Sequence, residues 1–162
     1  VIFLVVRSQT ELFVGAAPGI RARGGAAVDL TVHVHDGRES RVVAPGAVVR
    51  PGDKARFEVL VGKPGFVMVV GMDDRGEHYA CWPQEDNPAA MKMDASDKPV
   101  VSPTAIEFDE TPGDEHLFAL WCDHPFMLSD LAPSVTASVF AAPATAPVGC
   151  TMTRVDLRKV GR

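Results

Sequence analysis

This 162-residue sequence lacks the features by which several functional classes are usually detected. Its net charge is −5, which argues against a nucleic-acid partner, and no dense group of lysines and arginines suits a membrane surface. The apolar run at residues 1–6 is far shorter than the roughly 20 residues that span a bilayer. We find no catalytic motif and no repeat of fixed period. The sequence therefore favours a role in binding over catalysis.

The chain does have enough apolar material for one folded domain. Hydrophobic residues make up 46% of it, so it can bury a full core, and its length fits a single domain. Its 13 prolines and 14 glycines suit many strands joined by tight turns better than they suit helices. We expect residues 21–162 to form this domain. Residues 1–20 are expected to be a lead-in, either a first strand or the end of a membrane helix, followed by a linker.

The clearest structural signal lies in residues 51–83, where turn residues separate short runs with strand periodicity. Apolar and charged residues alternate over 54–61, which predicts an edge-like strand with one wet face. The run 66–70 is apolar on both sides, which predicts a central strand covered on both faces. A further turn at 73–76 leads into a returning strand at 77–82. We therefore predict an antiparallel meander over this region.

Similar patterns predict further strands at 28–34, 41–43, 47–49, 106–108, 117–121 and 151–160. The chain therefore fits an all-β fold, an antiparallel β-sandwich of about eight to nine strands. The one helix that we expect is a turn or two at 125–131, ended by Pro133, and helix should stay below about a quarter of the residues. The predicted core contains Val32, Phe57, Val59, Phe66, Met68, Val69, Leu117, Ala119 and Leu120.

The three cysteines, Cys81, Cys122 and Cys150, are an odd number without the spacing of a metal site. One disulfide is possible, and Cys122 with Cys150 is the favoured pair because both fall in late strand-like segments. We favour three buried free thiols over a disulfide, since free cysteine is among the most buried residue types. The redox compartment therefore stays open at this point.

Two groups of residues have side chains that bind metal ions, and for each we favour a simpler interpretation. His33 and His35 share one face of a strand, with Cys122, His124 or His116 as further ligands, but we expect these histidines on the solvated face. Two acidic turns carry oxygen ligands for Ca²⁺, but we expect them only to keep the loops solvated. The turns consist of Asp73, Asp74 and Glu77, and of Asp109, Glu110, Asp114 and Glu115. We therefore predict no metal, no cofactor and no catalytic residue.

The place where we expect a partner is the long loop at residues 84–104. Loops longer than about 12–15 residues in compact domains are usually functional or disordered. This loop follows Tyr79 and Trp82, and it contains Met91 and Met93, whose flexible side chains suit adaptable contacts. These four residues form the predicted partner surface, for a protein or a small ligand. Over this partner surface we favour a solvated connection, with the aromatic rings in the core.

Several short motifs together resemble a known family. They are Arg21-x-Arg23-Gly24-Gly25, Pro51-Gly52-Asp53-Lys54-x-Arg56-Phe57, Pro64-Gly65-Phe66-Val67-x-Val69, Asp74-x-Gly76 and the segment at 106–117. In these residues the chain resembles the bacterial module called domain of unknown function 4384, over roughly residues 20–131. The resemblance implies a non-catalytic accessory domain of anti-sigma-factor-like or other regulatory proteins, often placed after a membrane helix. It transfers no functional residue to this chain.

We therefore expect a non-catalytic domain of a larger bacterial protein, one that binds a ligand or a protein for sensing or regulation. One alternative is a metal-dependent enzyme or a metal-binding domain that uses zinc or calcium. Another alternative is a purely structural spacer. An extracytoplasmic position, on the periplasmic side of a membrane-anchored protein, is slightly favoured over the cytoplasm.

Overall fold

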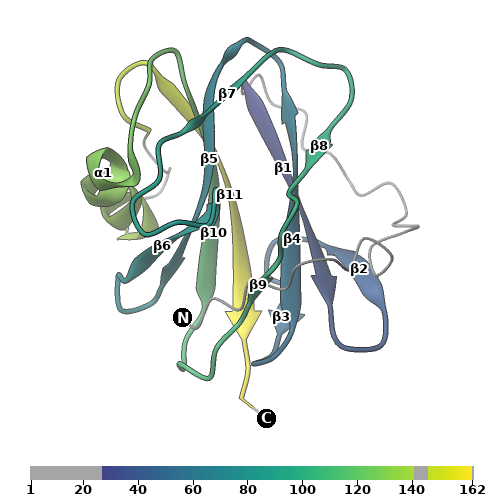
Figure 1. Ribbon diagram of the computed structural model, residues 1–162. Helices are drawn as coiled ribbons and strands as arrows, with labels where there is room; N and C mark the ends of the chain where they lie inside the picture. Colours follow the sequence, from purple (N-terminus) through teal and green to yellow (C-terminus); the bar gives the residue numbers. More distant parts are fainter. Residues whose placement is uncertain (1–26, 141–145, 162) are drawn as a thin grey trace.

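A computed structural model describes residues 27–140 and 146–161, and there the chain is mostly β, with 49% strand and 9% helix. Two sheets face each other, and one helix lies on the outer side of the second sheet (Figure 1). The predicted all-β sandwich with a single helix is therefore confirmed. The predicted lead-in at 1–20 and the motif at 21–25 lie outside the described residues.

The first sheet is built around two long, internal strands. Its order is β2 (Ser40–Val43), β1 (Val28–His35), β4 (Lys54–Val61) and β8 (Val100–Val101), and β9 (Ile106–Glu107) also pairs with β4. All of these pairs are antiparallel. Strands β1 and β4 align over their full length, with Val28 opposite Val61 and His35 opposite Lys54.

The second sheet contains the longest strands. Its order is β3 (Val48–Val49), β11 (Cys150–Lys159), β10 (Glu115–Cys122), β5 (Gly65–Asp73) and β6 (His78–Trp82), and β7 (Met91–Met93) also pairs with β5. The β3–β11 pair is parallel and the other pairs are antiparallel. The described residues thus hold eleven strands, more than the eight or nine predicted, because strands of two or three residues are too short to show a period in the sequence.

Two apolar layers hold these elements together. The layer between the sheets includes Val32, Val34, Phe57, Val59, Val67, Val69, Leu117, Ala119, Val155 and Leu157. The layer between the second sheet and the helix includes Met68, Val70, Met72, Phe118, Leu120, Leu128, Leu131 and Val135. Successive residues of β5 alternate between the two layers, so the prediction of a strand covered on both faces is confirmed. Every predicted core residue is buried except Phe66, which is half-buried at the margin of the second layer.

The helix differs from the prediction in both position and length. Helix α1 spans Leu128–Phe140 and passes through Pro133 instead of ending there. Proline removes one backbone hydrogen bond near the helix start, but burial of Leu128, Leu131 and Val135 against the second sheet outweighs that loss. No helix in the described part of the chain is long and apolar enough to cross a membrane.

The predicted meander is wrong in its first connection. Strand β4 lies inside the first sheet, between β1 and β8, whereas β5 lies inside the second sheet. The turn at 62–65 therefore carries the chain from one sheet to the other, and only β5 and β6 pair as neighbours. The alternation of apolar and charged residues along β4 indicates that its outer face is partly solvated. It does not indicate whether the strand lies at an edge or which strand lies beside it.

Candidate functional site

The segment 84–104, predicted as one irregular loop, carries two short strands. Strand β7 pairs with Gly65–Val67 of β5, and β8 pairs with Glu58 and Val59 of β4. Figure 1 shows this segment passing from the second sheet to the first along one side of the sandwich. These two strands form because the fold brings β5 and β4 beside the segment. Local sequence patterns do not show such pairing. The segment therefore contributes outer strands to both sheets.

The four predicted partner residues do not form an exposed surface patch. Tyr79 and Trp82 are each only 7% exposed and belong to the core between the sheets. Met91 and Met93 are half-buried against the same core. The favoured interpretation of Tyr79 and Trp82, aromatic rings packed in the core, is therefore confirmed. Binding of a partner near the two methionines stays a prediction.

Exposed apolar side chains in this segment lie instead on β8. Val100 is 41% exposed and Val101 is 46% exposed, and β8 ends the hydrogen-bonded order of the first sheet. The adjoining residue Ser102 fixes this strand, since its N–H donates to Phe57 O at 2.7 Å and its Oγ accepts from Phe57 N at 3.0 Å. Arg56 Nε also donates to Ser102 O at 3.0 Å. We call the pair Val100–Val101 the β8 edge. Its side chains are exposed, and the hydrogen bonds of Ser102 fix its backbone to β4.

The two histidines of β1 are buried, contrary to the prediction that solvent surrounds them. His33 and His35 are each 7% exposed, although they face away from the core between the sheets. His33 Nε2 lies 3.1 Å from Glu58 Oε2, and His35 Nδ1 accepts from Gly37 N at 3.0 Å. Strand β1 is internal, so long side chains of β4 flank these rings, with Arg56 directly opposite His33. In the part of the chain that is described, neither histidine belongs to a group of three or more metal-binding side chains that could share an ion.

The two acidic turns meet at one end of the sandwich, where their carboxylates bind the protein itself. Asp74 Oδ2 accepts from Asp114 N at 2.7 Å, and Asp74 Oδ1 lies 2.9 Å from His116 Nε2. The other ring nitrogen of His116 lies 2.8 Å from Asp156 Oδ1. Asp73 Oδ1 accepts from the N–H groups of residues 75 and 77 at 2.9 Å each. These contacts tie β5, β10 and β11 together and give the carboxylates a structural role.

The connection through Asp74 predicts a pH-dependent stability. The N–H of Asp114, and then His116, hold the pKa of Asp74 below its ordinary value of 3.8. A lowered pKa in the folded state stabilises the fold above that ordinary value, and the effect disappears as pH falls through the folded-state pKa. We expect Asp74→Asn to lower the free energy of unfolding at pH 7 by about 0.5–1 kcal/mol, because the carboxylate is half-exposed. The difference should shrink toward pH 2 in urea titrations, whereas the exposed control Asp97→Asn should change little at either pH.

A second charged group lies between the sheets, and sequence reasoning missed it. Lys159 Nζ lies 2.5 Å from Glu115 Oε1 and 3.1 Å from Asp109 Oδ1, and Tyr79 OH donates to Glu115 Oε2 at 2.7 Å. Glu115 is 1% exposed and Lys159 is 8% exposed. One signal was present in the sequence. Lys159 continues the alternation of Val155 and Leu157, so it falls on the buried face of its strand.

The pKa values in this group fit a structural pairing. Burial raises the pKa of Glu115, against the opposing effect of Lys159 and Tyr79. Burial lowers the pKa of Lys159, but the contacts with Glu115 and Asp109 outweigh it and raise the pKa overall. Burial raises the pKa of Tyr79 well above its ordinary value, so its hydroxyl keeps the proton that it donates. The charges of Glu115 and Lys159 are thus paired with each other between the sheets, where both side chains are buried.

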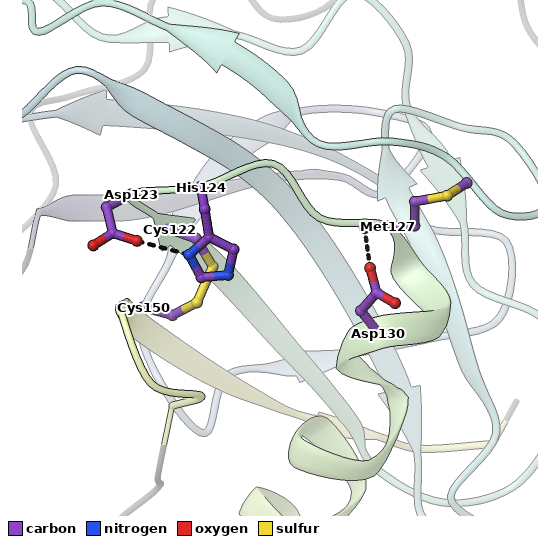
Figure 2. The surroundings of a disulfide bond; sticks show 6 residues. All are labelled: Cys122, Asp123, His124, Met127, Asp130 and Cys150. Atoms are coloured by element: carbon purple, nitrogen blue, oxygen red, sulfur yellow. Dashed lines mark hydrogen bonds and ion pairs between the residues drawn. A yellow bond between two sulfur atoms is a disulfide. The ribbon is translucent and has the colours of Figure 1, made fainter.

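The chosen pair is bonded, with Cys122 and Cys150 joined at 2.05 Å, so the prediction of three free thiols is wrong for these two cysteines. Cys81 is a buried free thiol, as predicted, and burial raises its pKa well above the ordinary value. Figure 2 shows His124 beside the disulfide, with the ring directed at Asp123. In the described ranges, one group of at least three metal-binding side chains is close enough to share an ion, namely Cys122, His124 and Cys150.

Comparisons of the chain with family models, with curated proteins and with solved structures gave no significant match. The resemblance to domain of unknown function 4384 therefore stays a prediction, and the function has to be argued from the residues themselves.

Proposed function

We propose that this chain is a non-catalytic accessory domain that binds an extended protein segment along the β8 edge. The observation that carries the proposal is the pair Val100–Val101, exposed on the terminal strand of the first sheet. A terminal strand can pair with an added strand through main-chain hydrogen bonds, while alternate side chains provide specificity. Exposed apolar side chains at such an edge give the added strand something to pack against.

The ionisable groups support a binding role over catalysis. The carboxylates of the acidic turns accept hydrogen bonds from nearby backbone and side chains, and Glu115 is paired inside the sandwich. A general acid or base has to reach a substrate proton. These groups instead join strands of the fold.

The disulfide supports the extracytoplasmic location that we propose for the domain. Disulfides persist mainly in oxidising compartments, including the bacterial periplasm. Cys122 and Cys150 join the directly opposed ends of β10 and β11. A domain of this kind suits a sensing or regulatory protein on the periplasmic side of the membrane.

The β8 edge is tested by placing a charge on it. We expect Val101→Lys to abolish capture of extended peptides from a displayed peptide library, because a lysine on an edge strand opposes strand addition. Val48→Lys is the matched control. Val48 is 43% exposed on β3, which ends the second sheet, so the same charge there should leave capture unchanged.

Two outcomes would count against this function. Equal capture by wild type and Val101→Lys, with unchanged circular dichroism, would remove the β8 edge as the binding site. The absence of any captured peptide with the wild-type chain would favour the structural spacer instead. Met91→Ala, in the half-buried β7, tests whether the predicted methionine surface contributes independently.

A further inference from the structure

Three metal-binding side chains gather at one end of the second sheet. Cys122 is the last residue of β10, Cys150 is the first residue of β11, and the two lie directly opposite each other. His124 follows two residues after Cys122, and the ligand atoms of all three lie within 4.8 Å of one another. Two cysteine sulfurs and an imidazole are the ligand types that Zn²⁺ prefers. Figure 2 shows the His124 ring overlying the disulfide.

Asp123 orients the imidazole as a metal-binding histidine requires. Nδ1 of His124 lies 2.7 Å from Asp123 Oδ1. When Nδ1 carries the proton and donates it to this carboxylate, Nε2 keeps its lone pair for a metal. Histidines that bind metals almost always have such a partner on the other ring nitrogen. Both side chains of the Asp–His pair are accessible, His124 being 52% exposed and Asp123 64% exposed.

The turn before Cys150 leaves room for this pair. Asp123 N donates to Gly149 O at 3.0 Å. Gly149 has a φ of +76°, and a Cβ atom at this position would stand 2.7 Å from Asp123 Oδ1. Glycine is therefore needed here both for the backbone conformation and for the position of the carboxylate. Two segments far apart in the sequence thus position His124 beside the sulfurs.

We propose that Cys122, Cys150 and His124 form a Zn²⁺ site that the disulfide closes and that reduction opens. A dithiol reductant supplies two electrons and two protons. The S–S bond breaks, both cysteines become thiols, and the reductant becomes a disulfide. Zn²⁺ then binds both sulfurs as thiolates, with release of two protons, and takes His124 as its third ligand. Solvent would occupy the fourth position, as it does in zinc sites that have three protein ligands.

The sulfurs have to separate for this change, and the fold permits it. Two sulfurs bound to one tetrahedral zinc stand about 3.8 Å apart, since each Zn–S bond is about 2.3 Å. This separation is within reach of rotation about the side-chain bonds of the two cysteines once the S–S bond is broken. The strands themselves stay in place, because β10 pairs with β5 on one side and with β11 on the other along its whole length.

The folded state should survive reduction. The disulfide closes a loop with a sequence separation of 28, so its loss costs about 3–4 kcal/mol in the chain-entropy model. That cost is smaller than the usual stability of a domain, about 5–15 kcal/mol, and both apolar layers remain intact. Bound Zn²⁺ would then restore part of the lost link between β10 and β11.

A cobalt titration tests the site on the full chain. Co²⁺ replaces Zn²⁺ in such sites, and its thiolate charge-transfer band reports the bound sulfurs directly. We expect the chain reduced with a phosphine to bind Co²⁺ in a one-to-one ratio under anaerobic conditions, and Zn²⁺ to abolish the band. The oxidised chain should show no band. A reduced chain without the band would overturn the proposal, as would loss of the β-sheet circular dichroism on reduction that Zn²⁺ does not restore.

Variants measured in the reduced state separate a metal site from a structural bond. We expect His124→Ala to weaken Co²⁺ binding by at least about tenfold, and Asp123→Asn to weaken it by about tenfold, the usual effect of losing the carboxylate behind a metal-binding histidine. His78→Ala, a partly exposed histidine on β6, is the matched control and should bind as the wild type does. Wild-type affinity in His124→Ala, or a charge-transfer band in Cys122→Ser/Cys150→Ser, would show that the bound metal uses other ligands.

Discussion

Replacing Lys159 with methionine is expected to lower the free energy of unfolding by about 3–5 kcal/mol, the usual cost of breaking a buried ion pair. Methionine fills the volume of the aliphatic part of lysine but leaves the carboxylate of Glu115 without its cation. Glu115 is 1% exposed, so solvent cannot replace the lost contact. Urea unfolding at pH 7 measures the effect. The exposed lysine of β7 gives the matched control, and Lys92→Met should stay within about 0.5 kcal/mol of the wild type.

The double variant tests whether the loss comes from the unpaired charge. We expect Glu115→Gln/Lys159→Met to recover much of the stability, because the most deeply buried carboxylate is then neutral and only Asp109, whose side chain is 15% exposed, keeps its charge. Tyr79 OH donates to Glu115, and the amide oxygen of the substituted side chain can still accept that hydrogen bond. A double variant as unstable as Lys159→Met alone would contradict this cause and indicate lost packing.

The pH dependence gives a further check with a definite sign. Burial already raises the pKa of Glu115 with Lys159 present, and removing the lysine leaves burial unopposed by its strongest partner. A carboxyl with a raised pKa contributes its stability below the unfolded value of 4.5 and loses it as pH rises through the folded value. The deficit of Lys159→Met should therefore shrink as pH falls from 7 toward about 5. An unchanged deficit would mean that Glu115 is not the group responsible.

The fold class was predictable because the burial of each strand face determines the local pattern of apolar and polar residues. Alternation along β1, β4 and β11 and the apolar run in β5 follow from the period of a strand and the number of its covered faces. Which strands pair with each other does not show in the local pattern. The turn at 62–65 has the same residues whether the chain returns beside itself or crosses to the other sheet, which is why the predicted meander is wrong. Pro133 misleads in the same way, since packing of α1 on the sheet outweighs a local preference.

The sites too were predictable only as far as they depend on local sequence. Strand-like surroundings select Cys122 and Cys150 as the pair able to bond, but they do not show that the bond forms. The approach of His124 and Asp123 depends on a turn that Gly149 shapes from elsewhere in the sequence. A large aromatic residue before a long loop favours a partner surface at Trp82. Its burial depends on the opposite sheet, which no local pattern describes. The exposed pair Val100–Val101 gives no signal, since two valines in a sequence suit a core as well as an edge.

Removing the ring of Phe118 should also cost about 3–5 kcal/mol, since a large side chain is lost from a closed apolar layer. Phe118 is fully buried between the second sheet and α1, in the layer that also holds Leu131. The guanidinium of Arg154 stands 5.6 Å from its ring centre and donates to Ser138 O of α1 at 2.6 Å. Phe118→Ala therefore opens a cavity and weakens a link to the helix. We expect the melting temperature to fall by roughly 10 °C, as the usual scaling for a domain of this size implies.

Two further variants test whether the lost stability comes from the apolar layer between the second sheet and α1. Phe66→Ala removes the same ring from the half-buried margin of that layer and should cost less than about half as much, because solvent can fill the space. Phe57→Ala opens a cavity of similar size between the sheets, and should match Phe118→Ala in urea unfolding. Hydrogen exchange distinguishes the two, since only Phe118→Ala should speed exchange at the amides of α1 ahead of the strands. If α1 were attached only loosely, Phe118→Ala would cost no more than Phe66→Ala, and the two-layer account of the fold would be wrong.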